Sequence, residues 1–329
     1  MNFQTTVELP ADFSSVSHAD QILLMGSCFA ENMGNFLREG KFQVDMNPFG
    51  ILYNPLSIGA AWKEIRNGKV YEESDLFFYK GLWHSSMHHG SFSAESPCLV
   101  LQHINDRLQQ AHERVQRLDW LMLTFGTAYV YEQKDTGKVV ANCHKLPEKQ
   151  FTRRLLSMDE IVAEYQALIA DLTALRPQAR LLFTVSPIRH QRDGMHANQL
   201  SKATLLLAID RLQQLFPGRV CYFPSYEIVL DELRDYRFYA EDMVHPSPLA
   251  VRYLWQRFSD ACFSPETLRI LEAVDDIRRD LEHRPFHPHS EAYHRFLGQI
   301  VLKIERLIGK YPYLDFQKEI ELCHIRLNP

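Results

Sequence analysis

The chain has 329 residues, of which 46% are hydrophobic and 12% aromatic, and its formal net charge is −5. This composition is typical of a packed globular protein, and the length suits one large α/β domain or two ordinary ones. The small negative charge gives no electrostatic reason to expect nucleic acid or an anionic membrane as a partner. No apolar stretch approaches the roughly 20 residues that cross a bilayer, so no membrane span is expected.

The N-terminal stretch has neither the basic region nor the apolar region of a signal peptide, so none is expected. Six cysteines are spread along the chain without a C-x-x-C pair. In a chain of this size, that pattern indicates free thiols in a reducing compartment. We therefore expect a cytoplasmic protein.

Short apolar runs alternate with segments of helical spacing over residues 1–263. The expected elements, in chain order, are a strand at 22–25, a helix at 31–38, a strand at 42–44, a helix at 56–66, a β-ribbon insertion near 70–93, a helix at 99–118, a strand at 120–126, a helix at 158–175, a strand at 179–187, a helix at 198–216, a strand at 219–226 and a helix at 248–263. Apolar strands without alternation, joined by long helices, predict a doubly wound, mainly parallel sheet covered on both faces. In such a sheet, ligands bind beyond the carboxyl ends of the strands.

Residues 264–329 differ from the rest and predict a helical C-terminal extension. Its stretch "EAYHRFLGQIVLKIERLIGKY" carries an apolar stripe at helical spacing. The stripe suits docking onto the chain's own sheet domain, or contact with a partner helix or a second copy in a homodimer. The sequence does not choose between these, so the oligomeric state stays open.

The first expected strand ends in Gly26-Ser27-Cys28, where two possible nucleophiles precede a helix. A strand–glycine–nucleophile–helix turn lifts a side chain out of the sheet and places it at a helix N-terminus. The dipole and unpaired N–H groups there stabilise an oxyanion and lower the pKa of a thiol. A turn with a helix cap is the simpler alternative.

Asp242 and His245 follow the last expected strand. An acid three residues before a histidine can accept from one ring nitrogen, which leaves the other nitrogen to act as a general base. Because this pair and the Gly26-Ser27-Cys28 turn both follow strands of one sheet, the sequence predicts a nucleophile–histidine–acid site at the sheet edge.

Six blocks carry a resemblance to a known family: GSCFA at 26–30, NPFGILYNP at 47–55, LTFGTAYVY at 123–131, ANCHKLP at 141–147, TVSPIRH at 184–190 and DMVHPS at 242–247. Through them, roughly the first 260 residues resemble the GSCFA family, which is placed in the SGNH/GDSL hydrolase superfamily. The resemblance implies a three-layer α/β/α fold and acyl chemistry of the Ser-His-Asp type. It implies no substrate, and no cofactor is expected.

The superfamily's first block is Gly-Asp-Ser, with the serine as nucleophile. Laid over it without a gap, Ser27 takes the Asp position and Cys28 the nucleophile position. Cys28 is therefore preferred, and Ser27 stays open as the nucleophile of a turn shifted by one residue. The second block implies Gly50 as an oxyanion donor.

The superfamily's third block is Gly-x-Asn-Asp, whose asparagine donates to the oxyanion. This chain has Gly126-Thr127-Ala128-Tyr129 there, without a side-chain amide at that position. The missing donor is worth about 3 kcal/mol of the reaction barrier. A third donor is therefore expected from Thr127 or from Asn142, and Gly126 is expected in the same oxyanion or substrate-binding site.

Two further polar clusters have structural alternatives. Histidines 84, 88 and 89, with Cys143 and His144, could bind a metal, but they lack the spacing of a zinc site, so a polar loop is expected and no metal. The Arg-His-Gln-Arg-Asp segment at 189–193 could bind an acidic substrate group or form a solvated loop. Polar residues at 198, 201 and 202 are expected to cap the following helix.

The leading hypothesis is a cytoplasmic hydrolase that forms a covalent acyl-enzyme from a small-molecule ester or thioester. Cys28 or Ser27 attacks, His245 moves the proton, Asp242 orients His245, and Gly50 with the backbone at residue 28 holds the oxyanion. A Cys28 thiol near a helix N-terminus should have a lowered pKa. An acyltransferase using the same site, and a non-catalytic binding module on this fold, are the alternatives.

Overall fold

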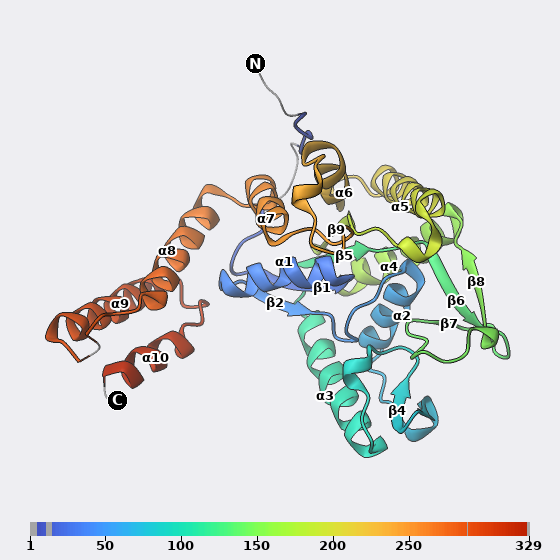
Figure 1. Cartoon of the computed structure of the whole chain (residues 1–329), viewed down its shortest axis with the longest axis horizontal. Helices are drawn as coiled ribbons and strands as arrows, with labels where there is room; N and C mark the ends of the chain where they lie inside the picture. The colour runs from blue at the N-terminus through green and yellow to red at the C-terminus, as the bar shows by residue number, and fades with distance from the viewer. Residues whose placement is uncertain (1–4, 11–14, 288, 328–329) are drawn as a thin grey trace. The chain divides into compact units, whose positions relative to one another are not determined.

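The computed structural model describes residues 5–10, 15–287 and 289–327, so part of the N-terminal stretch expected to lack a signal peptide lies outside the described residues. The chain divides into two compact units (Figure 1). Described residues within 1–13, 21–35 and 44–261 form the first unit, and those within 14–20, 36–43 and 262–329 form the second.

The first unit is built on a five-stranded sheet of order β10-β9-β5-β1-β2. These strands are β1 (Gln21–Gly26), β2 (Gln43–Met46), β5 (Trp120–Phe125), β9 (Arg180–Val185) and β10 (Val220–Tyr222). Parallel pairing joins β1 to β5, β5 to β9 and β9 to β10, which confirms the predicted parallel arrangement of the four apolar runs. β1 and β5 lack alternation because they are buried on both faces.

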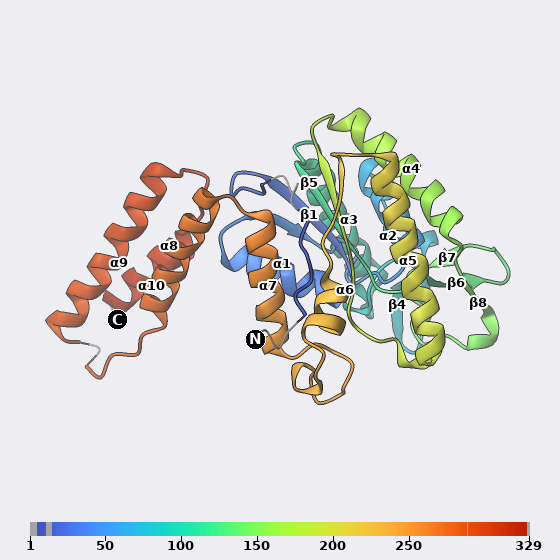
Figure 2. The ribbon, with the colours of Figure 1, turned by 90° about the horizontal axis from the view of Figure 1, so that it is seen from above.

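Helices cover both faces of this sheet (Figure 2). One face carries α2 (Pro55–Arg66), α3 (Pro97–Val115), α4 (Met158–Leu175) and α5 (Met195–Leu215), and the other carries α7 (Pro248–Cys262) and the start of α1 (Cys28–Glu39). One apolar core joins the strands to the first group of helices, with Trp62, Tyr165 and Phe183 fully buried in it. The three-layer α/β/α architecture is therefore confirmed.

The strand order fixes where a ligand can bind. If these five strands are renumbered 1 to 5 along the chain, their order across the sheet is 2-1-3-4-5. This is a doubly wound order. The direction of winding changes between β1 and β5, so a crevice is expected beyond the carboxyl ends of these two strands. Ser27 follows β1 and Gly126 follows β5, at the same sheet edge.

Two small antiparallel sheets extend the first unit. One is a ribbon of β3 (Leu76–Tyr79) and β4 (Leu82–Ser85). The other consists of β6 (Tyr129–Gln133), β7 (Val139–Val140) and β8 (Phe151–Leu155), in the order β7-β6-β8, and the sequence did not predict it. Shorter turns are the 3₁₀ segments Glu73–Asp75, Gly90–Phe92, Glu148–Gln150, Gln191–Asp193 and Tyr236–Phe238, the helix α6 (Ser225–Glu227) and the π segment Ile228–Glu232.

Among its described residues the second unit contains the end of α1 and the helices α8 (Pro265–Glu282), α9 (Glu291–Lys310) and α10 (Gln317–Leu327). The predicted apolar stripe on α9 presents Leu297, Ile300 and Ile304 to a core shared with residues of α8 and with Cys323 of α10. This stripe is therefore already covered inside the second unit. Residues 15–20 and 36–43 also belong to this unit. There the His18 ring stacks on the Phe42 ring at a centroid distance of 3.9 Å.

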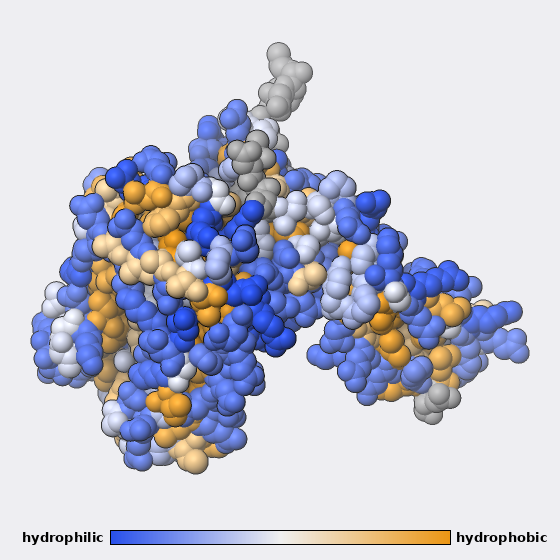
Figure 3. Space-filling view, turned by 180° about the vertical axis from the view of Figure 1, so that it is seen from behind, coloured by the Kyte–Doolittle hydropathy of each residue, from blue (hydrophilic) through white to orange (hydrophobic). Residues whose placement is uncertain are grey.

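The surface is mostly hydrophilic on the face seen in Figure 3, where apolar areas are small and separated. None of the described helices is both long enough and apolar enough to cross a membrane.

Candidate active site

A cavity of about 380 Å³ lies in the first unit, beyond the carboxyl ends of the central strands. Its lining comes from the segments that follow β1, β2, β5, β9 and β10, together with the small β7-β6-β8 sheet: Ser27, Cys28, Tyr53, Asn54, Thr127, Tyr129, Tyr131, Val140, Ala141, Arg153, Ser186, Ile188, Arg189, His190, Gln191, Arg192, Asp193 and His245. The structure thus brings Ser27, Cys28, Thr127 and His245 to one cavity. Its volume is within the roughly 300–1,000 Å³ common for small-molecule sites.

The turn between β1 and α1 is tightly held. Gly26 has a φ of +145°, and a Cβ atom there would lie 2.3 Å from the carbonyl oxygen of Thr124, so only glycine fits. The Gly26 N–H donates to Asn47 Oδ1 at 3.0 Å, and the Gly26 carbonyl accepts from Leu52 N–H at 3.0 Å. The next residue, Ser27, donates its N–H to the Thr124 carbonyl at 3.3 Å.

Ser27 precedes α1 and is only 1% exposed. Its Oγ accepts from the Phe29 N–H at 3.3 Å, and its carbonyl accepts from the Ala30 N–H at 2.8 Å. Ser27 therefore has the position and hydrogen bonds of a helix N-cap, so α1 begins at Cys28 and not at residue 31. Cys28 is only half-buried, and it carries one of the N–H groups that find no partner inside the helix.

Burial raises the pKa of the Cys28 thiol above its usual value. The backbone amides of Cys28 and Phe29 act against this effect, and so does Lys202, while Glu31 adds to it. The prediction of a lowered thiol pKa is therefore wrong, because the desolvation of the thiol outweighs the helix N-terminus. Cys28 is a protonated thiol at neutral pH.

Asp242 and His245 form a hydrogen-bonded pair in the loop before α7, with Nδ1 of the ring 2.5 Å from Oδ2 of the carboxylate. The other oxygen, Oδ1, accepts from the N–H groups of His245 at 2.9 Å and Val244 at 3.0 Å. These two backbone bonds, followed by the ring, lower the pKa of Asp242 to about 2. Among the described residues, His245 makes no hydrogen bond to Ser27 or Cys28. In active sites without substrate, the hydrogen bond between base and nucleophile is often long and tightens when substrate binds.

The amides of Gly50 and Gly126, expected at an oxyanion hole, are occupied. The Gly50 N–H donates to the Asn47 carbonyl at 2.8 Å, and Gly50 does not line the cavity. The N–H groups of Gly126 and Thr127 both donate to the Tyr53 carbonyl, at 2.7 and 3.0 Å. The structure therefore gives none of these three backbone amides to a ligand in the cavity.

The two expected side-chain donors differ in place. Thr127 lines the cavity, but its Oγ1 lies 3.1 Å from Ser201 Oγ and accepts from the Tyr129 N–H at 3.1 Å. Asn142 does not line the cavity, and its Oδ1 accepts from the His144 N–H at 2.9 Å. The structure thus brings Thr127 to the site and leaves Asn142 outside it.

Asn54 is a cavity residue that the sequence did not single out. It is 6% exposed, its Oδ1 accepts from the Ser57 N–H at 2.8 Å, and its Nδ2 donates to Ser57 Oγ at 2.9 Å. A side-chain amide has two N–H donors, so one remains for a ligand. In the sequence, Asn54 before Pro55 has the pattern of an ordinary helix cap. That pattern gives no sign that the side-chain amide can also donate to a ligand.

The polar residues near the start of α5 do not cap it, contrary to the prediction. The cap position belongs to Gly194. Asn198 Oδ1 instead accepts from the His190 N–H at 3.0 Å, and Ser201 Oγ accepts from the Ala128 N–H at 2.8 Å. These side chains fix the segments that follow β5 and β9.

Lys202 is the strongest of these internal ties and is only 1% exposed. Its Nζ donates to the carbonyls of Gly126 and Ser186, both at 2.6 Å, and so joins the ends of β5 and β9 beside the cavity. Burial, and then the nearby Arg189, lowers the pKa of Lys202 to about 7. Spacing alone could not reveal this, because the two carbonyls lie 76 and 16 residues away along the chain.

The predicted histidine cluster has structural partners. The His84 and His144 rings lie 4.4 Å apart, with His84 Nδ1 2.7 Å from Ser93 Oγ and His144 Nε2 2.8 Å from the Ser85 carbonyl. The buried His88 has its Nδ1 2.9 Å from Ser85 Oγ. Across the residues that the structure describes, no group of three His, Cys, Asp or Glu side chains could hold a metal ion.

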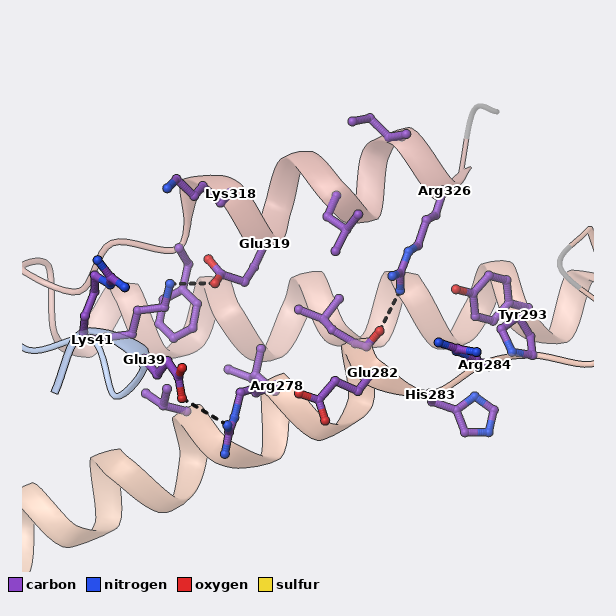
Figure 4. Close-up of a pocket in the computed structure, with 18 of the residues that line it drawn as sticks. Glu39, Lys41, Arg278, Glu282, His283, Arg284, Tyr293, Lys318, Glu319 and Arg326 are labelled. Atoms are coloured by element: carbon purple, nitrogen blue, oxygen red, sulfur yellow. Dashed lines mark hydrogen bonds and ion pairs between the residues drawn. The ribbon is translucent and has the colours of Figure 1, made fainter. Parts of the chain in front are cut away.

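A larger cavity of about 930 Å³ lies within the second unit (Figure 4). Ion pairs cross its rim between Lys41 and Glu319 at 2.6 Å and between Arg278 and Glu39 at 3.4 Å. Its lining, within the described part of the chain, includes neither serine nor cysteine. Size alone would favour this cavity, but the nucleophile candidates belong to the smaller one.

The first unit is thus a doubly wound α/β/α domain whose cavity lies at the carboxyl edge of the sheet and carries two nucleophile candidates and an aspartate–histidine pair. The chain belongs to the GSCFA family, whose model matches residues 21–258. Residues 274–329 match the model described as the GSCFA domain protein, C-terminal domain. The predicted family is therefore confirmed.

Several solved structures are similar to this chain at low identity. A putative platelet activating factor from Streptococcus pneumonia is 13% identical, with 76% of this chain and 86% of that chain covered and a TM-score of 0.36. A carbohydrate esterase family 3 protein from Talaromyces cellulolyticus is 10% identical, with 77% and 98% covered and a TM-score of 0.35. An acetyl xylan esterase from the rumen bacterium Butyrivibrio proteoclasticus is 11% identical, with 80% and 64% covered and a TM-score of 0.35. A comparison with curated proteins found no match.

Proposed function

We propose that this protein is an acyl hydrolase that cleaves small-molecule esters or thioesters through a covalent acyl-enzyme on Cys28. One observation carries the proposal: Cys28 lines the same cavity as His245, whose ring is hydrogen-bonded to Asp242. Cys28 is preferred to Ser27 because it is the more exposed of the two and because Ser27 Oγ already accepts a backbone hydrogen bond.

The Asp242–His245 pair supports the role of general base. A carboxylate can only accept, so the proton of a neutral ring lies on Nδ1 and Nε2 keeps its lone pair. As the Cys28 sulfur attacks the acyl carbon, Nε2 takes the thiol proton and then passes it to the departing alcohol or thiol. Since the thiol is protonated at rest, deprotonation accompanies the attack.

Two donors in the cavity suit the oxyanion that this attack creates. One is the Cys28 N–H at the helix N-terminus, and the other is the second N–H of the Asn54 side chain. Water then attacks the thioester, with His245 again taking the proton. This step releases the carboxylic acid and restores the thiol.

A reducing compartment suits this chemistry, and we place the protein in the cytoplasm as part of the proposal. The supporting observation is that Cys28, Cys98, Cys143, Cys221 and Cys323 are all free thiols. A reducing compartment keeps the proposed nucleophile in its thiol form.

The test uses 4-nitrophenyl acetate, whose first turnover appears as a burst of nitrophenol when an acyl-enzyme accumulates. We expect Cys28→Ala to abolish the burst, while Cys98→Ala, which removes an exposed thiol outside the cavity, keeps it. A full burst from Cys28→Ala, together with its loss in Ser27→Ala, would make this a serine enzyme. No burst or turnover from the parent protein with this and other activated esters would leave the non-catalytic binding module.

A further inference from the structure

Arg189 is a half-buried cation in the cavity wall, in the segment after β9. Its Nη1 donates to Gln199 Oε1 at 2.7 Å and to the Tyr226 hydroxyl at 3.2 Å. The Tyr226 hydroxyl in turn donates to Gln199, so the two residues form one neutral support. The guanidinium is therefore positioned without a countercharge from either neighbour.

The other two arginines of the cavity differ in this respect. Arg153 forms an ion pair with Asp193, and Arg192 forms one with Glu148. Within the described ranges of the chain, no carboxylate forms an ion pair with Arg189. Among the described lining residues three guanidinium groups are thus present, and of these Arg189 is the one whose charge has no ion-pair partner there.

The donors of Arg189 that remain are suitably placed for an anion. Both hydrogen bonds that Arg189 makes to described residues leave from Nη1, which leaves the N–H groups on Nε and Nη2 for an anion. This Nε–Nη2 edge is the side of a guanidinium that binds a carboxylate through two parallel hydrogen bonds. A planar carboxylate matches the geometry of this edge directly.

The surroundings add positive charge, and Asp193, the acid among the described lining residues, already pairs with Arg153. Lys202 lies in the wall behind the cavity, and Arg189 helps to lower its pKa to about 7. His190 is kept neutral, because burial and then Lys202 lower its pKa to about 4. An anion bound at Arg189 would relieve the repulsion between the two cations.

We infer that Arg189 binds a carboxylate of the substrate, so that the natural ester or thioester carries an acidic group, as a dicarboxylic acid monoester does. This inference rests on the proposed function for the reaction, but the binding of the anion can be measured without it. Arg189 is then a specificity-determining residue, and the Cys28–His245 chemistry does not depend on it.

The first arm of the test compares 4-nitrophenyl hydrogen adipate with 4-nitrophenyl methyl adipate, which differ only in the free carboxylate. A hydrogen-bonded charge pair is worth about 10- to 100-fold, so Arg189→Gln should lower kcat/KM for the acidic ester by that factor. We expect a change below about threefold for the methyl ester, since it cannot use the charge. Arg189→Lys keeps the positive charge but loses the two parallel N–H donors. Its kcat/KM for the acidic ester should therefore lie between the values for the parent protein and for Arg189→Gln.

The matched control is Arg211→Gln on α5, an exposed arginine that does not line the cavity. It should leave both rates unchanged. Raising the salt concentration should weaken the preference for the acidic ester in the parent protein. Equal losses on both esters in Arg189→Gln and Arg189→Lys would overturn the inference.

The second arm measures binding where no acyl-enzyme can form. Adipamic acid, with one carboxylate, and neutral adipamide are titrated calorimetrically into Cys28→Ala and into Cys28→Ala/Arg189→Gln. We expect adipamate to bind at least tenfold more weakly to the double variant, and adipamide to bind the two proteins alike. Arg189-dependent binding without any ester turnover would refute the proposed function alone. Turnover with binding that ignores Arg189 would refute this inference alone.

Discussion

The nucleophile turn and the aspartate–histidine loop face one cavity but are built in opposite ways. The turn at residues 26–28 is anchored to β5 and to the 47–52 segment by backbone and side-chain hydrogen bonds, and Ser27 is 1% exposed. The Asp242 and His245 side chains are 48% and 49% exposed, and the hydrogen bonds of the carboxylate to described residues all lie within residues 242–245. The core fixes the proposed nucleophile, whereas a local turn fixes the proposed base.

This difference assigns different consequences to substitutions on the two sides. On the loop side, a change should remove chemistry and leave the stability intact, because little is buried there. On the turn side, a change should cost stability as well, because the residues are buried and hydrogen-bonded.

The largest effect is expected for His245→Gln. Removing the proposed general base should lower kcat/KM by about a thousandfold, within the range for a positioned acid–base group. The melting temperature should stay within a degree or two, since the ring is half exposed. Steady-state kinetics and calorimetry check this, with the exposed His196→Gln as a control. A large loss of stability would contradict the picture of a locally built loop.

Asp242→Asn should cost about a hundredfold in kcat/KM, because the ring loses the carboxylate that fixes its tautomer and stabilises its charged form. Hydrogen bonds lower the pKa of Asp242 to about 2, so the carboxylate remains ionised as the pH falls until that value is approached. The activity of the parent protein between pH 4 and pH 8 should therefore show no titration of Asp242. A pH–rate series on both proteins tests this, and an unchanged rate for Asp242→Asn would contradict it.

Lys202→Met should cost stability, as changes on the turn side do, because Lys202 is buried and hydrogen-bonded. The substitution leaves the carbonyls of Gly126 and Ser186 buried without their donor, which should cost about 2 kcal/mol or more of unfolding free energy. Urea unfolding of the full-length protein measures the loss. The exposed Lys134→Met is the matched control, expected to change stability by less than about 0.5 kcal/mol. Equal stability of the two variants would show that the ends of β5 and β9 do not need this tie.

Cys28 should react slowly with iodoacetamide. Burial raises its pKa, so the thiolate fraction at pH 7 is small, and the rate of alkylation should still be rising above pH 9. The exposed Cys98 of the same protein serves as the internal reference and should react faster at pH 7. Peptide mapping after timed quenching gives both rates. If Cys28 were alkylated faster than Cys98 at pH 7, the thiol of Cys28 would have the lowered pKa that the sequence predicted.

The smallest effect is expected for Ser27→Ala, which removes a helix cap and leaves the proposed nucleophile in place. The loss should be about 1 kcal/mol of unfolding free energy. We expect kcat/KM to fall by no more than about tenfold, through a looser turn. Denaturation and burst kinetics on the same preparation separate the two effects. A burst lost without any loss of stability would point to Ser27 as the nucleophile.

The central sheet could be predicted from the sequence, because parallel strands buried on both faces leave uninterrupted apolar runs such as residues 120–125. The β7-β6-β8 sheet could not, since strands like Phe151–Leu155 are short, partly exposed and rich in arginine. It matters to the site because it supplies Tyr129, Tyr131 and Arg153 to the cavity.

The site was predictable where spacing along the chain encodes geometry, as it does for Asp242 and His245. Prediction failed where the decisive contact is long-range or depends on burial. Gly50 has a glycine conformation, but its amide closes a local turn with Asn47. The sign of the Cys28 pKa shift depends on desolvation, which no motif records.

The most direct test of the central claim is to locate the acyl group itself. The protein is mixed with 4-nitrophenyl acetate, quenched in acid within the burst, digested and mapped by tandem mass spectrometry. We predict one acetyl group on Cys28, held as a thioester that neutral hydroxylamine removes. An acetyl group on Ser27, or the absence of any adduct on either residue in a protein that still turns over ester, would contradict it.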